Sequence, residues 1–261
     1  MFDYHVHSTV SYDGRGTPEE MAAAALRAGL TEICFTDHLD YLHCVPRSQT
    51  TFTPQTYAAA YDRLAVPGLA IRTGTEVGLT PWNQAEIEKD LRAHPYDFVL
   101  GSLHFIRDED PYLPPYWVGR DPLMAERDYY RELITCLKIH DNFDVLGHLT
   151  YIGKCKAHPC PRIIPLEDYR EIMDEIFKVL IAKGKGLEIN TSGVDLCGDF
   201  LPGIAFLRRF RELGGEIVTV GSDAHDASRM GQYIPQALAI AKEVFGHVCT
   251  FANREPIFHK L

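Results

Sequence analysis

Short apolar runs alternate along the chain with longer stretches in which apolar and polar residues mix. The short runs are rich in β-branched and aromatic residues, which is typical of strands. They lie at residues 3–8, 32–38, 70–77, 98–105, 145–148, 186–190 and 216–220, and a further short strand is expected after Val248. Helices are predicted between them, over residues 18–28, 54–64, 84–93, 124–139, 166–182, 202–213 and 234–244. This alternation predicts a parallel sheet with right-handed crossovers.

Turn and capping residues mark several boundaries of these elements. Thr17 and Pro18 are a typical helix start, because a hydroxyl caps the first turn and proline is favoured at the first helical position. Gly29 is a typical helix end. Residues 107–122 contain four prolines and several aromatic residues, which predicts a long ordered loop over one face of the protein.

The length of the chain favours one α/β barrel in a single domain that covers residues 1–261. The 261 residues are enough for a large core but too few for two domains of ordinary size. An open, doubly wound sheet is the competing fold, but His5 and His7 stand where its Gly-rich phosphate turn would follow the first strand. We therefore expect a barrel of seven or eight strands, with a working face where the carboxyl ends of the strands meet.

Composition and charge limit the classes of partner that the protein is expected to bind. The formal net charge of −10 argues against nucleic acid as the main partner, but not against a small phosphate in a metal-lined pocket. The sequence contains neither a signal-peptide pattern nor an apolar run of about 18 residues, so we expect a cytoplasmic protein with no membrane partner. Seven cysteines include no Cys-x-x-Cys pair. Cys155 and Cys160 allow a second metal site, but reduced thiols are the favoured interpretation.

Histidines and carboxylates recur where the predicted strands end. His5 and His7 share one strand face because alternate strand residues point the same way. Each such residue alone has an ordinary structural explanation, such as a histidine that hydrogen-bonds a loop. Six histidines and three carboxylates directed at one face are better explained as ligands for zinc, iron or manganese. They are His5, His7, Asp13, His38, Glu76, His104, His148, Asp223 and His225.

The other histidines provide a contrast, because they fall in predicted loops, near helix ends or in the tail. We expect them on the surface. They are His43, His94, His140, His158, His247 and His259.

With these motifs in view, the sequence resembles the PHP (polymerase and histidinol phosphatase) family of metallophosphoesterases. The matching motifs follow the family's order along nearly the whole chain. They are Asp3-Tyr4-His5-Val6-His7-Ser8, Phe35-Thr36-Asp37-His38, Gly74-Thr75-Glu76-Val77-Gly78, Gly101-Ser102-Leu103-His104-Phe105, Gly147-His148-Leu149 and Gly221-Ser222-Asp223-Ala224-His225. Two further segments resemble the stand-alone histidinol-phosphatase branch, namely 187–193 and 251–258.

The resemblance implies a distorted, TIM-like (β/α)7 barrel with three divalent metal ions. One ion would be held by His5, His7, Glu76 and Asp223, and Glu76 would bridge to a second ion shared with His104 and His148. The third would be held by Asp13, His38 and His225. Glu76, Asp223 and His225 would be catalytic.

Charge counting agrees with a phosphate ligand if all three sites fill. Three divalent cations and three carboxylates leave a charge of +3, and a bridging hydroxide would lower it to +2, which matches a phosphomonoester dianion. The implied reaction is hydrolysis of a small phosphomonoester by that hydroxide, formed near neutral pH because the metals lower the pKa of the water.

Substrate contacts are less clearly marked. After the strand at 145–148, a basic loop contains Lys154, Lys156 and Arg162, each of which is either a phosphate ligand or a solvated surface cation. Glu188 and Asn190 share a strand face and are candidates to bind a substrate amine or imidazole, although either has a structural alternative. The branch would be expected to have an arginine soon after Ser192-Gly193, where this chain has Val194 and Asp195.

The leading hypothesis is hydrolysis of L-histidinol phosphate to L-histidinol and phosphate, a step of histidine biosynthesis. The first alternative is a related phosphoesterase for another small phosphate or a nucleotide. The second is a non-catalytic, metal-dependent binding or regulatory protein, which the intact ligand set disfavours.

Overall fold

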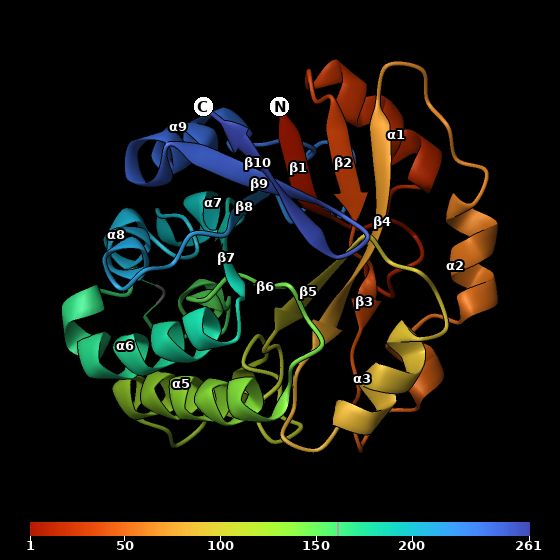
Figure 1. The fold of residues 1–261 in the computed structure, drawn as a ribbon. Helices are drawn as coiled ribbons and strands as arrows, with labels where there is room; N and C mark the ends of the chain where they lie inside the picture. The colour runs from red at the N-terminus through yellow and green to blue at the C-terminus, as the bar shows by residue number, and fades with distance from the viewer. Residues whose placement is uncertain (161) are drawn as a thin grey trace.

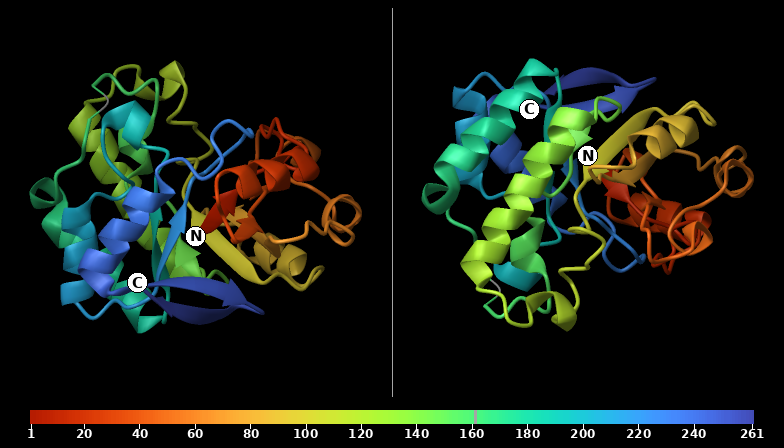
Figure 2. Two further views of the ribbon diagram at one scale, coloured as in Figure 1. Left: turned by 90° about the horizontal axis from the view of Figure 1, so that it is seen from above. Right: turned by 90° about the horizontal axis from the view of Figure 1, so that it is seen from below.

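Parallel strands form one sheet that curls into a nearly closed barrel, with helices around its outside (Figures 1 and 2). The computed structural model describes residues 1–160 and 162–261. In the described chain the barrel strands are β1 (Phe2–Val6), β2 (Glu32–Phe35), β3 (His38–Leu39), β4 (Ala70–Gly78), β5 (Phe98–Ser102), β6 (Val145–Leu146), β7 (Gly186–Asn190) and β8 (Val218–Gly221). Their order is β1-β2-β4-β5-β6-β7-β8, with β3 paired to β4, and every pairing is parallel. The predicted parallel α/β barrel is confirmed.

The seam of the barrel lies between β1 and the residues that follow β8. The Asp223 backbone N–H donates to the His5 carbonyl at 2.8 Å, and the His7 N–H donates to the Ala224 carbonyl at 2.9 Å. These bonds draw the segment after β8 against the end of β1. Two histidine-containing motifs from opposite ends of the sequence therefore meet.

Helices follow the strands, as predicted, and their ends differ from the expected ones by at most three residues. The longer helices are α1 (Pro18–Arg27), α2 (Pro54–Tyr61), α3 (Gln84–Leu91), α5 (Pro122–Ile139), α6 (Leu166–Ala182), α8 (Ile204–Glu212) and α9 (Ile234–Phe245). Short helical turns are η1 (Arg47–Gln49), α4 (Pro114–Trp117), η2 (Tyr151–Lys154) and α7 (Val194–Cys197). Helix α4 lies inside the region predicted as a loop. Within the described residues, none of these helices is both long and apolar enough to cross a membrane.

Local sequence explains how α1 begins and why the strands are apolar. The Thr17 hydroxyl accepts from the Glu20 backbone N–H at 3.2 Å, while the Glu20 carboxylate accepts from the Thr17 N–H at 2.9 Å. This reciprocal capping satisfies two backbone donors that would otherwise lack partners. Strands β5 and β7 are buried along their whole lengths, as expected for a parallel sheet covered on both faces.

The predicted strand at 32–38 is interrupted after Phe35 and resumes as β3. Asp37, in the gap, is fully buried, and its carboxylate accepts from the Ser8 N–H at 2.8 Å and the Ser11 hydroxyl at 2.9 Å. This carboxylate ties the loop after β1 to the strand ends. The loop contains Asp13, so the tie also helps to locate that residue.

The tail does not add a strand to the barrel. Strands β9 (His247–Ala252) and β10 (Glu255–Lys260) pair with each other in a separate antiparallel sheet, so the expected strand after Val248 was wrongly placed. The chain reverses because Asn253 and Arg254 both have positive φ values, of 50° and 67°, which suits a two-residue hairpin turn. The hairpin lies beside both chain ends in Figures 1 and 2.

Candidate metal centre

The six histidines and three carboxylates predicted from the strand ends converge at the carboxyl end of the barrel. They come from β1, β3 and β4 and from the loops after β1, β5, β6 and β8. Seven of them line a cavity of about 500 Å³, namely Asp13, His38, Glu76, His104, His148, Asp223 and His225. His5 and His7 lie beneath this lining and are fully buried. Spacing along the sequence thus identified residues that the fold brings together.

Glu76 lies at the centre of the cluster. Its Oε1 is 2.8 Å from His148 Nε2 and 3.2 Å from His104 Nε2. Its Oε2 is 3.2 Å from His5 Nε2 and 3.1 Å from His38 Nδ1. This second oxygen is buried and has no hydrogen-bond partner among the described residues, because neither approach has hydrogen-bond geometry. One carboxylate therefore touches histidines from four separate segments.

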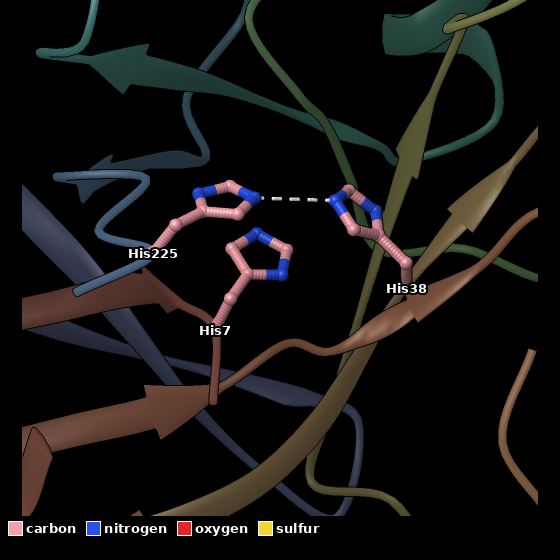
Figure 3. Close-up of side chains that lie close together, drawn as sticks. All are labelled: His7, His38 and His225. Carbon is pink, nitrogen blue, oxygen red and sulfur yellow. Dashed lines mark hydrogen bonds between the residues drawn. The ribbon is translucent and has the colours of Figure 1, made fainter. Parts of the chain in front are cut away.

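The histidines also meet one another in three pairs of Nε2 atoms. His5 and His7 approach at 3.0 Å, His104 and His148 at 3.4 Å, and His38 and His225 at 3.4 Å. Figure 3 shows the last pair, with the His7 ring close to both. Neutral imidazoles that present lone pairs to each other repel unless a proton or a cation lies between them. Buried nitrogens that face each other beside carboxylates fit divalent cations such as zinc.

The other two predicted carboxylate ligands, Asp13 and Asp223, also contact histidines of the cluster. Asp13 lies 3.2 Å from His225 Nε2 and 3.6 Å from His38 Nε2. Asp223 Oδ1 lies 3.6 Å from both His5 Nε2 and His7 Nε2. Every residue predicted as a ligand is thus within reach of at least one other.

Charge keeps the two central carboxylates ionised. Burial acts to raise the pKa of Glu76, but His5, His104 and His38 outweigh it and hold the pKa well below its ordinary range. Burial likewise opposes ionisation of Asp223, but Lys154 and the nearby histidines hold its pKa well below the usual value. Both groups can therefore act as anionic ligands at neutral pH.

Sequence reasoning missed Asp40, which is fully buried next to the cluster. Asp40 Oδ1 lies 2.9 Å from His104 Nδ1, and Oδ2 accepts from the Tyr12 hydroxyl at 3.2 Å. A carboxylate bound to the far nitrogen of a ligating histidine fixes the ring's orientation and tautomer. One signal was available, since Asp40 stands two residues after His38 and alternate strand residues share a face.

The predicted substrate residues divide into two groups. Lys154 lines the cavity, and its ammonium donates to Ser192 Oγ and to Asp223 Oδ2, both at 2.7 Å. Arg162 instead pairs with Glu126 on α5 at 2.9 Å. Glu126 also binds His158 and Tyr169, so it anchors this part of the loop away from the cavity.

Glu188 and Asn190 are buried and are not among the described residues that line the cavity. Glu188 Oε1 binds His5 Nδ1 at 2.7 Å, and Oε2 accepts from the His148 backbone N–H at 2.8 Å. The side-chain Oδ1 of Asn190 accepts from the Ser192 N–H at 2.9 Å, which ties down its own loop. The structural alternatives that we considered for both residues agree with this arrangement.

Other residues in the cavity wall were not singled out from the sequence. Asp110 and Tyr112 come from the proline-rich region at 107–122, which was expected to cover one face of the protein. The remaining additions are Tyr12, Arg15, Phe105, Tyr151, Leu196, Asp226 and Arg229.

Two predictions about the remaining histidines were wrong, because His140 and His158 are buried. His140 Nε2 bonds the Thr80 carbonyl at 2.7 Å, and His158 Nε2 bonds Glu126 at 2.9 Å. Their partners come from distant segments, so position near a loop did not reveal them. The seven cysteines are free, and Cys155 is buried whereas Cys160 is exposed.

Comparisons with known proteins agree with this geometry. The family model described as PHP domain matches residues 3–192. The chain is 30% identical to the histidinol-phosphatase of Lactococcus lactis subsp. lactis, over 96% of this chain and 94% of that protein. It is 26% identical to a probable histidinol-phosphatase of Clostridium acetobutylicum, over 99% of this chain and 96% of that protein.

A solved structure extends the likeness to three dimensions. The histidinol phosphate phosphatase of Lactococcus lactis, in a crystal structure with zinc, L-histidinol and phosphate, superposes with a TM-score of 0.84 at 27% identity. The match covers 98% of both chains. A nearly complete barrel, its cluster of histidines and carboxylates, and the family match lead to one conclusion: this chain belongs to the PHP domain family.

Proposed function

We propose that the protein hydrolyses L-histidinol phosphate to L-histidinol and phosphate, using divalent metal ions at the carboxyl end of the barrel. The observation that carries this proposal is the convergence of five histidines on Glu76 at the floor of an open cavity. The Lactococcus lactis relatives support the choice of substrate, because likeness extends over nearly the full length of both chains.

We further propose three metal ions, drawn from zinc, iron and manganese. The three facing pairs of histidine Nε2 atoms support this count, because each pair belongs to a different predicted ligand group. The proposed groups are His5, His7, Glu76 and Asp223; then Glu76, His104 and His148; and last Asp13, His38 and His225. When bound, such ions supply Lewis-acid activation of water and neutralise phosphate charge.

The protein's own side chains orient the histidines and bind the phosphate group in this reaction. Glu188 and Asp40 hold the rings of His5 and His104 from behind through their Nδ1 atoms. Lys154 presents an ammonium to the cavity, where it binds a phosphate oxygen of the substrate. Its bonds to Ser192 and Asp223 restrict its motion, which lowers the entropic cost of that contact.

Recognition of the cationic end of the substrate falls to carboxylates that face the cavity. Glu188 and Asn190 lie behind His5 and are therefore not proposed as substrate contacts. Asp110 lies in the cavity wall, and its Oδ1 accepts from the Tyr112 N–H at 2.7 Å. That bond orients the carboxylate for a substrate ammonium or imidazole N–H.

We also propose that the functional domain runs to residue 261. The family match ends at residue 192, but β8 and the residues Asp223 and His225 lie beyond it. Without β8 and these two residues, the barrel would lack its seam and the cluster would lack two of its members. A cytoplasmic location stays a prediction.

A substrate panel tests the proposed function. Metal-loaded protein should hydrolyse L-histidinol phosphate with a kcat/KM at least about 100-fold above that for p-nitrophenyl phosphate, because only the former engages the cationic-end contacts. Greater activity on a nucleoside monophosphate would favour the alternative phosphoesterase. Absence of turnover on every ester, by protein that retains metal, would favour a binding or regulatory role.

A further inference from the structure

The segment that follows β7 accepts hydrogen bonds from two cationic side chains that belong to neighbouring loops. Ser192 Oγ accepts from the Lys154 ammonium at 2.7 Å, and Asp195 Oδ2 accepts from Arg229 Nη1 at 2.8 Å. Lys154 belongs to the loop after β6 and Arg229 to the loop after β8. Since β6, β7 and β8 are neighbours in the sheet, the two cations flank the segment. Lys154, Ser192, Asp195 and Arg229 all line the cavity described above.

Arg229 is held more firmly than a surface arginine usually is. Asp195, its partner, also accepts from Gln232 Nε2 at 3.0 Å and from the Tyr233 hydroxyl at 2.7 Å. These hydrogen bonds, with that from Arg229, hold the pKa of Asp195 below its ordinary value, so the carboxylate is charged at neutral pH. Asp195 therefore contacts three side chains of a single loop.

The loop itself is ordered by short-range bonds. The Arg229 N–H donates to the Asp226 carbonyl at 3.1 Å, and the Gln232 N–H donates to the Arg229 carbonyl at 3.1 Å. The Thr191 hydroxyl donates to the Gln232 carbonyl at 2.6 Å, which ties the loop to the end of β7. The backbone that carries Arg229 is thus fixed from both sides.

The guanidinium retains capacity for a ligand. It carries five N–H donors in a planar fork, and within the described residues its side-chain bonds go to Asp195 alone. The Arg229 side chain is 33% exposed at the cavity, so its remaining donors are accessible. A planar, permanently charged fork suits a phosphate better than a flexible ammonium does.

We propose that Arg229 binds a phosphate oxygen of the substrate together with Lys154, and that Asp195 is the positioning residue for Arg229. This inference rests on the proposed function for the identity of the substrate, but not for the presence of its phosphate group.

Inorganic phosphate is the probe for the test. Its dissociation constant is measured on the metal-loaded enzyme by titration calorimetry, and its inhibition constant against p-nitrophenyl phosphate. Arg229→Gln leaves an amide able to bond Asp195 but removes the charge. Because one charge-assisted hydrogen bond is lost, this substitution should raise both constants at least about tenfold. It should also raise KM more than it lowers kcat. Arg229→Lys should recover part of the affinity.

Asp195→Asn tests the positioning role. It should weaken phosphate binding less than Arg229→Gln does, and it should have little further effect when added to Arg229→Gln, because Asp195 acts through the arginine. Arg208→Ala is the matched control, since Arg208 pairs with Glu243 on the exposed surface of α8 and α9. It should leave phosphate binding unchanged.

The outcomes separate this inference from the proposed function. If Arg229→Gln and Asp195→Asn lower the melting temperature but leave phosphate affinity at the wild-type value, Arg229 is only a structural tether and the inference is wrong. If the wild-type enzyme binds phosphate through Arg229 but does not prefer L-histidinol phosphate, the substrate assignment fails and the inference stands. Metal content, measured for every variant, must match the wild type for a weakened affinity to count in favour.

Discussion

Glu188 Oε1 lies 2.7 Å from His5 Nδ1, on the side of the imidazole opposite to the Nε2 atom that approaches Glu76. Its other oxygen accepts from the backbone N–H of His148. One buried carboxylate thus orients the ring of His5, which is a predicted ligand. It also holds the backbone of His148, which is a second predicted ligand. We therefore expect its effect on the substrate to be indirect.

Glu188→Gln should therefore impair the metal centre and leave substrate preference intact. Loss of a carboxylate behind a ligating histidine costs about 10–100-fold in metal affinity or activity. We expect kcat/KM for L-histidinol phosphate and for p-nitrophenyl phosphate to fall by the same factor. Glu243→Gln, which alters an exposed glutamate on α9, serves as control. A selective loss of L-histidinol phosphate turnover would instead make Glu188 a substrate contact.

Asp40→Asn should act similarly on a different part of the cluster. The amide can still bond one neighbour, but it no longer provides a charged acceptor for both His104 and Tyr12. We expect activity to fall about tenfold or more and the affinity for the most weakly held metal ion to fall with it. Activity titrated against added zinc or manganese measures both effects. Unchanged metal affinity would show that His104 is oriented without Asp40.

Glu76→Gln should abolish activity, because Glu76 touches histidines of all three proposed ligand groups. Turnover should drop to below about one-thousandth of the wild-type value, and metal content should fall by more than one ion per chain. Elemental analysis and a phosphatase assay measure the two effects.

His94→Ala is the control for Glu76→Gln. His94 is a half-buried histidine that packs on Tyr57 and Tyr96, away from the cluster. It should retain wild-type metal content and activity. Equal losses in Glu76→Gln and His94→Ala would mean that the cluster has been wrongly assigned.

The pH dependence of stability should depend in part on Glu126, which lies outside the cluster. Burial acts to raise its pKa, but hydrogen bonds from His158, Tyr169 and Arg162 outweigh burial and hold the pKa below its ordinary value. A carboxylate whose pKa is lowered by folding stabilises the protein above its unfolded pKa, and this stabilisation is lost as pH falls through the folded pKa. Wild-type stability should therefore decline below about pH 4.5.

Glu126→Gln should remove this part of the decline. At pH 7 we expect a loss of about 2–4 kcal/mol in the free energy of unfolding, because Arg162 loses its buried partner. The difference from wild type should shrink at acidic pH. Denaturant unfolding at several pH values measures it. Glu175→Gln, which breaks an exposed pair with Lys138 between α5 and α6, should change stability by less than about 1 kcal/mol. A pH-independent difference would contradict the role given to the Glu126 charge.

Much of the site could be predicted because the residues proposed as ligands stand at the carboxyl ends of strands. In a barrel of parallel strands these ends meet by construction, so the sequence positions of His5, Glu76 and His148 already implied their proximity. Apolar strand runs and helix caps are also local signals. The order of the elements and most of their boundaries therefore followed from the sequence.

Loops and side-chain partners did not follow in the same way. Nothing periodic indicates where Arg162 points, and it is Glu126 on α5 that draws it away from the cavity. One strand was predicted after Val248, but a short apolar run does not specify its partner, and the turn at Asn253 directs β10 back onto β9. Likewise His140 is buried by a contact with Thr80, sixty residues away.

Glu188 shows most clearly which features follow from the sequence and which depend on the tertiary structure. Period-two alternation places its side chain on the same face of β7 as that of Asn190, and the sequence alone therefore determined that these two polar side chains share one face. Only the tertiary structure decided that the His5 ring stands between this carboxylate and the cavity. Alternation sets a direction along one strand, whereas the group met in that direction depends on the seam that brings β1 beside β8.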